Sequence, residues 1–167
     1  MVRVVDRVAG VPRVAYAGRS TRSDAVGERL RDAQVIRALA AAAQATGLDV
    51  RNAACRVADR PEGAVAHYEF AVAARDVWSA QETQRFAVEL DGAIGREAAG
   101  YRTARAAGRL TAATVRRLDG DAFLRDWHTS VATGIRPTQV KDRMFRQDHT
   151  LWGQLTGTDP VSEEGTA

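Results

Sequence analysis

A lone lysine is the residue of this sequence best suited to catalysis. Of the 24 Lys and Arg residues, only Lys141 is lysine and the other 23 are arginine. Its ammonium group is a compact point charge that fits where the planar guanidinium of arginine does not. Lys141 is therefore a candidate for stabilising negative charge in a reaction. The alternative is that it is an ordinary cation on a solvated surface.

The sequence lacks the motifs that assemble an active site within one short segment. It contains no G-x-S-x-G motif, no P-loop, no H-E-x-x-H motif and no C-x-x-C motif. The three histidines lie far apart, without the spacing of metal ligands, so we expect no metal site. Two carboxylate pairs, Asp24 with Glu28 and Asp119 with Asp121, are better explained by turns and helix starts than by catalysis.

The length and composition are typical of one ordinary globular domain. The chain has 167 residues, of which 45% are hydrophobic and 27% charged. A net charge of +3 does not imply nucleic-acid binding, and no apolar run is long enough to cross a membrane. Cys55 is the sole cysteine and cannot form an internal disulfide, and the N-terminal sequence is not typical of a signal peptide. We expect a cytoplasmic protein that binds neither nucleic acid nor membrane.

A β-hairpin and a polar loop are predicted at the start of the chain. Apolar and polar residues alternate over 2–18 on either side of a Gly-Val-Pro turn. Two strands alone are marginally stable in water, so this hairpin should pack on the rest of the chain or on another chain. Residues 18–27 are polar, rich in hydroxyl groups and bounded by glycines, which is typical of a loop or hinge.

Helical periodicity begins after this loop. Apolar residues spaced by three, four and seven positions predict a helix over 32–46, which Gly47 ends. Ser79 and Glu82 have the spacing of a capping box and start a second helix. We expect that helix to continue to about Gly108.

Short strands alternate with these helices. Segments 48–59 and 64–75 predict an antiparallel hairpin, in which Tyr68, Phe70 and Val72 share the core face. The remaining predicted elements are a strand over 110–118, a helix over 120–133 that presents Phe123, Leu124 and Trp127 together, and a short helix over 148–155. The predicted fold class is α+β: a small antiparallel sheet covered by helices in the order αββαβα, preceded by the N-terminal β-hairpin and hinge.

The polar loop resembles the hinge of a known enzyme superfamily. Residues 18–30 read G-R-S-T-R-S-D-A-V-G-E-R-L. They are similar to the hinge of adenylate-forming enzymes, and more closely to the G-R-x-x-x-S-D-x-x-G-E-K-L form of bacterial acyl-acid amido synthetases, relatives of the plant auxin-conjugating enzymes. Further segments resemble the C-terminal lid domain of that family in the same order: 68–70, 86–91, 101–110, 115–118, 123–127 and 134–141, the last similar to its Gln-Tyr-Lys-Thr-Pro-Arg loop.

The resemblance implies how the chain is organised and which residues form its site. Residues 1–19 would form a hairpin at the junction between the enzyme's body and its lid, 20–27 the hinge, 28–156 the lid domain and 157–167 a flexible tail. Lys141 would be the catalytic residue. The residues that contact the nucleotide would be Arg19, Ser23, Asp24, Gly27 and Glu28.

The resemblance also implies a reaction. Enzymes of this family join a carboxylate to the α-phosphate of ATP, release pyrophosphate, and let an amine displace AMP. ATP, with magnesium, would be bound mainly by a body domain that precedes the lid and that this sequence lacks. Lys141 would stabilise the negative charge that develops in the first step. The expected partners are a lid-less adenylating body protein and, in the complex, the acyl acid and the amine.

Three roles fit these features. The first is a stand-alone lid subunit that completes the ligase, with the hairpin of residues 2–18 docked on the body. The second is an inactive domain excised from a larger ligase. The third is a repurposed lid fold that acts as a binding or regulatory module. It is suggested mainly by residues 142–144, after Lys141, which differ from the family's lysine loop.

Overall fold

A mixed three-stranded sheet forms the centre of the domain. The computed structural model describes residues 2–8, 11–16, 22–58, 63–134 and 143–157. The sheet has the strand order β5-β6-β7. Its strands are β5 (Asn52–Val57), β6 (Tyr68–Ala74) and β7 (Thr114–Asp119). β5 pairs antiparallel with β6, as expected, whereas β7 pairs parallel with β6.

The expectation of an antiparallel sheet is therefore wrong for β7. Between β6 and β7 the chain forms α2 (Ala80–Glu97) and α3 (Ala99–Ala106). Such a helical crossover returns the chain to the starting end of the sheet, so the next strand runs in the same direction as the first. The α+β class and the N-terminal hairpin are confirmed.

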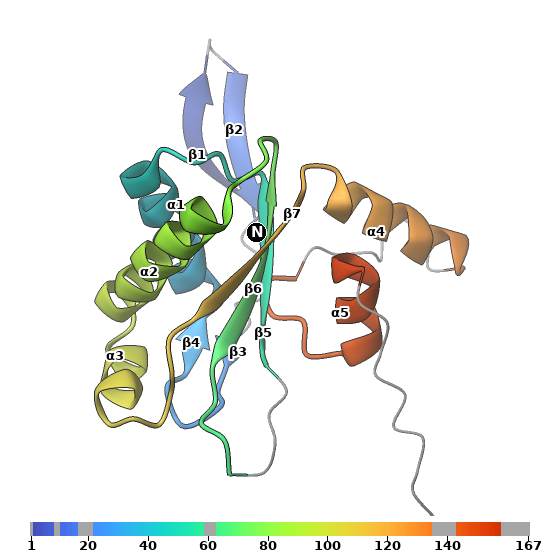
Figure 1. Ribbon diagram of the computed structural model, residues 1–167. Helices are drawn as coiled ribbons and strands as arrows, with labels where there is room; N and C mark the ends of the chain where they lie inside the picture. The colour runs from blue at the N-terminus through green and yellow to red at the C-terminus, as the bar shows by residue number, and fades with distance from the viewer. Residues whose placement is uncertain (1, 9–10, 17–21, 59–62, 135–142, 158–167) are drawn as a thin grey trace, which may run out of the picture.

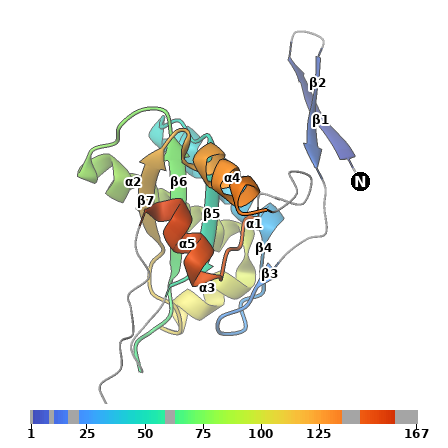
Figure 2. The same cartoon turned by 90° about the vertical axis from the view of Figure 1, so that its right-hand side faces the viewer.

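Helices cover both faces of the sheet. α1 (Asp32–Thr46), α2 and α3 lie on one side, and α4 (Ala122–Ala132) and α5 (His149–Thr156) lie on the other, as Figure 1 shows. The α4–α5 side, which faces the viewer in Figure 2, is built on a smaller core that includes Phe123 and Trp152. Each face of the sheet is therefore apolar.

Alternation along β6 places its side chains in both cores. Tyr68, Phe70 and Val72 belong to the larger core under α1 and α2, which confirms the predicted core face. Ala71 and Ala73 point to the other face and belong to the smaller core. All five are fully buried, so β6 is the central strand on which both helical layers pack.

Local signals set most helix boundaries. α1 has the predicted bounds, and Gly47 ends it in the left-handed conformation at φ 70°. The predicted capping box starts α2, because the Glu82 amide donates to the Ser79 hydroxyl. The single helix predicted up to Gly108 is wrong: Ala98, with φ −129° and ψ 101°, is extended and separates α2 from α3.

One predicted core residue of α4 faces solvent. Leu124 is 57% exposed and so does not share the core face with Phe123.

A short segment near the C-terminus covers the outer edge of β5. The Cys55 amide donates to the Met144 carbonyl at 2.6 Å, and the Arg146 amide donates to the Cys55 carbonyl at 2.9 Å. Phe145 thereby forms a parallel bridge with Cys55. An uncovered strand edge would present unpaired backbone groups, so this segment completes the sheet.

Two further strand pairs precede α1. β1 (Val2–Val8) and β2 (Val11–Tyr16) form the predicted antiparallel hairpin, which stands apart from the helices in Figures 1 and 2. β3 (Arg22–Ser23) and β4 (Leu30–Arg31) form a second antiparallel pair beside the start of α1. Within the segments that the structure describes, no helix is both long and apolar enough to cross a membrane.

Candidate functional site

A buried glutamate holds the loop between β3 and β4. Glu28 is only 4% exposed, although its side chain carries a carboxyl group. Its Oε1 accepts the Ala25 amide at 2.7 Å and its Oε2 accepts the Val26 amide at 2.8 Å. The Tyr68 hydroxyl also donates to Oε1. Burying a carboxylate is costly unless donors satisfy it, and here donors from the loop and from β6 converge on one side chain.

Tyr68 connects this loop to the central strand. Burial, reinforced by the hydrogen bond to Glu28, raises the pKa of Tyr68 above its ordinary value, while the nearby Ser23 hydroxyl opposes this rise. The phenol therefore stays protonated at neutral pH and remains a donor to Glu28. The sequence placed this ring in the core but gave no role to its hydroxyl. The available signal was that a buried tyrosine hydroxyl normally requires a partner.

Two polar side chains from distant segments also hold this region. Arg109, which follows α3, donates from Nη1 to the Val26 carbonyl at 2.8 Å. Gln147 donates from Nε2 to the Ser23 hydroxyl at 3.4 Å, and its Oε1 accepts the Val57 amide at 3.3 Å. Gln147 therefore contacts both β3 and the end of β5. No local pattern in the sequence marks Arg109 or Gln147, because their partners lie far away in the chain.

Close backbone packing fixes the loop from another side. A Cβ atom at Gly100, in α3, would lie 2.3 Å from the Glu28 carbonyl oxygen and 3.0 Å from its carbonyl carbon. Only glycine allows α3 to approach the loop this closely. The extended Ala98 that ends α2 permits this approach, since it redirects the chain immediately before Gly100. A glycine within a helical pattern is the sequence signal for such a contact.

The structure brings together four of the residues that the hinge resemblance selected. Ser23, Asp24, Gly27 and Glu28 lie in β3 and its loop, with Ser23 and Glu28 buried. Asp24 accepts the Gly27 amide at 2.7 Å, and Gly27 has a φ of 93° that favours glycine. The carboxylates of Asp24 and Glu28 thus accept hydrogen bonds from their own loop. Their roles toward a nucleotide stay predictions.

The other two predicted site residues, Arg19 and Lys141, lie outside the described residues. The structure next describes the chain at Arg143, after the predicted lysine loop. In the segments that are described, no three His, Cys, Asp or Glu side chains are grouped closely enough to hold a metal ion.

A second, partly buried polar cluster supports the crossover between β6 and β7. Asp91, in α2, accepts the Tyr101 hydroxyl at 2.5 Å and the Ala113 amide at 2.9 Å. Arg105 pairs with the same carboxylate, with 3.1 Å between Nη2 and Oδ2. Burial, together with the hydrogen bond to Asp91, raises the pKa of Tyr101. This cluster joins α2, α3 and the approach to β7, and we interpret it as structural.

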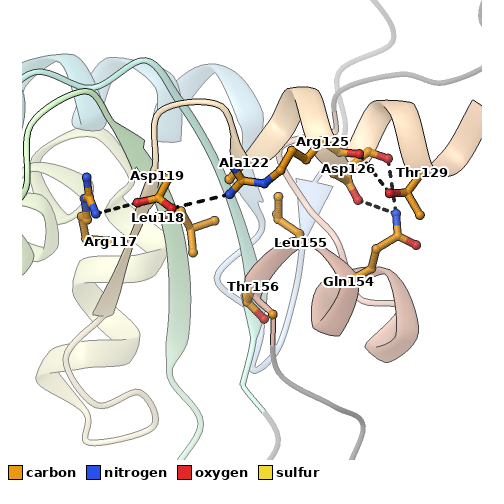
Figure 3. A pocket seen from close by; sticks show the side chains of 11 residues that line it. Arg117, Leu118, Asp119, Ala122, Arg125, Asp126, Thr129, Gln154, Leu155 and Thr156 are labelled. Carbon is orange, nitrogen blue, oxygen red and sulfur yellow. Dashed lines mark hydrogen bonds and ion pairs between the residues drawn. The ribbon is translucent and has the colours of Figure 1, made fainter.

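An open pocket of about 430 Å³ lies between the end of β7, α4 and α5 (Figure 3). Its charged groups largely neutralise one another: Arg117 pairs with Asp119 at 2.9 Å, and Arg125 lies 3.7 Å from the same carboxylate. Leu118 and Leu155, which line it, belong to the core under α4 and α5. The pocket is therefore on the opposite face of the sheet from Tyr68, and it does not extend the site at the β3–β4 loop.

Comparison with known proteins identifies the domain. The GH3 family C-terminal domain matches residues 33–149, which is most of the chain. The chain belongs to the GH3 family. Among curated proteins, none matches this GH3 domain in sequence.

Solved structures share the fold of this GH3 domain. AtGH3.15 acyl acid amido synthetase in complex with 2,4-DB matches it with a TM-score of 0.68 and 13% sequence identity, over 94% of this chain and 29% of that one. GH3.15 acyl acid amido synthetase matches with a TM-score of 0.69 and 12% identity, over 94% of this chain and 30% of that one. The chain therefore spans less than a third of the length of these enzymes.

Replacing Glu28 tests whether it holds the loop. In Glu28→Gln, an amide nitrogen replaces one acceptor and faces a donor, so we expect the free energy of unfolding to fall by about 2–4 kcal/mol. Asp24→Asn is the matched control, because it removes the same charge from the same loop but at a site that is more exposed. It should cost no more than about 1 kcal/mol. Urea unfolding at neutral pH measures both, and equal losses in the two variants would contradict this role.

Replacing Gly100 tests the close contact between α3 and the loop. The Cβ of Gly100→Ala meets backbone atoms, which cannot rotate away, so we expect a loss of about 1–3 kcal/mol. Gly95→Ala is the control, since its nearest atom, the Arg102 Cβ, is 4.0 Å away. That variant should gain up to about 1 kcal/mol from helix propensity. If thermal unfolding shows that both alanines stabilise, the contact is not as close as the structure places it.

Proposed function

We propose that this GH3 domain is the lid of an ATP-dependent, adenylate-forming acyl-acid amido synthetase. The observation that carries the proposal is the match of residues 33–149 to the GH3 family C-terminal domain. The two similar solved chains, each described as an acyl acid amido synthetase, are more than three times as long as the part that matches. The lid would work with a body that binds ATP and magnesium, and we propose that this body is a separate protein.

The first proposed step makes an acyl-adenylate. A carboxylate oxygen of the acid attacks the α-phosphorus of ATP, and the bond from that phosphorus to the bridging oxygen breaks, so pyrophosphate leaves with the electron pair. Lys141 would place its ammonium group beside the oxygens on which negative charge develops. This interaction would stabilise the transition state more than the ground state. In the second step an amine attacks the acyl carbon, the bond from that carbon to the phosphate oxygen breaks so that AMP leaves with the electron pair, and the amine loses a proton to solvent.

Contacts of the segment after Lys141 support this assignment. Residues 144–146 are hydrogen bonded to β5, and Gln147 then contacts Ser23 in β3. The segment that follows the predicted lysine loop is thus attached beside the predicted hinge. If rotation at the hinge brings Lys141 to the reacting groups, the hinge and the lysine loop must move together. These contacts would couple the two segments in that way.

The internal contacts of the loop support the assignment of ATP to the body. Glu28 uses both carboxylate oxygens within the chain, and one oxygen of Asp24 accepts the Gly27 amide. These groups are therefore engaged in folding the loop. The lid would contribute cations to the reaction, and the body would contribute the phosphate-binding loops.

Substitution of Lys141 by arginine is the sharpest test of the proposed function. The body protein is co-purified with the chain from the source organism, and acid-dependent ATP–pyrophosphate exchange is measured on the complex. We expect Lys141→Arg to lose nearly as much activity as Lys141→Ala, on the order of a hundredfold, because the larger guanidinium misplaces the charge. Arg143→Lys, the reverse exchange two residues away, is the control and should stay close to the parent.

Other outcomes would contradict the proposal. Lys141→Arg activity within about twofold of the parent would show that any cation serves at this position. Exchange by the purified chain alone would remove the need for a body. A body protein that adenylates without the chain, and whose rate the chain merely alters, would instead identify a regulatory module.

A further inference from the structure

We propose that Arg22 and Arg31 together bind an oxyanion, either a phosphate or a carboxylate group. Arg22 lies directly opposite Arg31 in the β3–β4 register. Ser23 and Leu30, the other cross-strand pair, are buried, whereas both arginines are exposed. Side chains alternate between the faces of a strand, so the two arginines project from the same outer face. This site goes beyond the proposed function, since it does not depend on Lys141.

The two arginines are arranged unfavourably for the protein alone. Like charges directly opposite each other on neighbouring strands repel and weaken the strand pair. β3 and β4 contain only 2 residues each, so few backbone contacts offset this repulsion. Among the described residues, neither arginine has an ion-pair partner. An anion bound between them would remove the repulsion.

The nearby carboxyl groups are oriented toward other partners. Glu28 faces the core and binds the Tyr68 hydroxyl. Asp24 accepts the Gly27 amide and lies 4.0 Å from Arg29. Asp32 accepts the amide of the next residue at 2.8 Å. In the described part of the chain none of these three carboxylates pairs with Arg22 or Arg31, so a ligand can supply the neutralising group.

The chemistry of the pair selects oxyanions. Each guanidinium offers parallel N–H donors that match two oxygens of a phosphate or a carboxylate, and hydrogen bonds between charged partners are the stronger ones. The Glu28 contacts fix the loop that joins β3 to β4, so the backbone positions that carry the two arginines are set before a ligand arrives. Such preorganisation lowers the entropy cost of binding.

Thermal unfolding of the full chain tests this site without any partner protein. The Tm is measured with inorganic pyrophosphate, with malonate, and with sodium chloride at equal ionic strength. We expect one oxyanion to raise the Tm by about 3–6 °C beyond chloride when it is about tenfold above its Kd. A larger shift with pyrophosphate identifies a phosphate site, and a larger shift with malonate a carboxylate site. If chloride produces the same shift as both oxyanions, the effect is screening alone and the proposal fails.

Charge variants separate a specific site from net charge. Arg22→Gln and Arg31→Gln should each abolish the oxyanion-dependent shift. Arg75→Gln is the matched control, because it removes the same charge. Arg75 is exposed and, among the described residues, lacks an ion-pair partner. Arg75→Gln should keep the shift, and an equal loss in this variant would overturn the proposal.

A charge reversal tests the repulsion between the two arginines. Arg31→Glu should raise the Tm in low salt, because the new carboxylate attracts Arg22. A fall in that Tm would contradict the cross-strand repulsion.

Discussion

The hydrogen bonds to the Glu28 carboxylate are the interaction on which the candidate site depends. They join two loop amides and the Tyr68 hydroxyl of the central strand in one buried cluster. Buried polar groups of this kind are costly when unpaired, so loss of the Glu28 carboxylate would leave its three donors unsatisfied. The loop therefore behaves as part of the domain, and the positions of Ser23, Asp24 and the flanking arginines follow from it.

The packing of the sheet explains how distant segments reach this loop. β6 is buried on both faces, so helices from both halves of the chain must cover it. The crossover through α2 and α3 brings Gly100 and Arg109 to the loop from one direction. The segment that covers the edge of β5 brings Gln147 from another. In the proposed lid, these contacts would transmit hinge movement to the lysine loop.

Features set by neighbouring residues were predictable from the sequence, and features set by distant contacts were not. The bounds of α1, the capping box at Ser79 and the core face of β6 depend on local periodicity and capping, and all were predicted correctly. The parallel pairing of β7 and the break at Ala98 depend on tertiary packing. Motif resemblance found the loop, but the contact between Glu28 and Tyr68 spans 40 positions and leaves no local pattern.

Amide hydrogen exchange in the loop is the most direct test of the central claim. The amides of Ala25 and Val26 donate to the buried Glu28 carboxylate, whereas the Gly27 amide donates to the more exposed Asp24. If Glu28 holds the loop on the sheet, the first two amides should exchange slowly, at rates approaching those of β6, while the Gly27 amide exchanges faster. Fast exchange of all three at the rate of an unprotected loop would contradict the account.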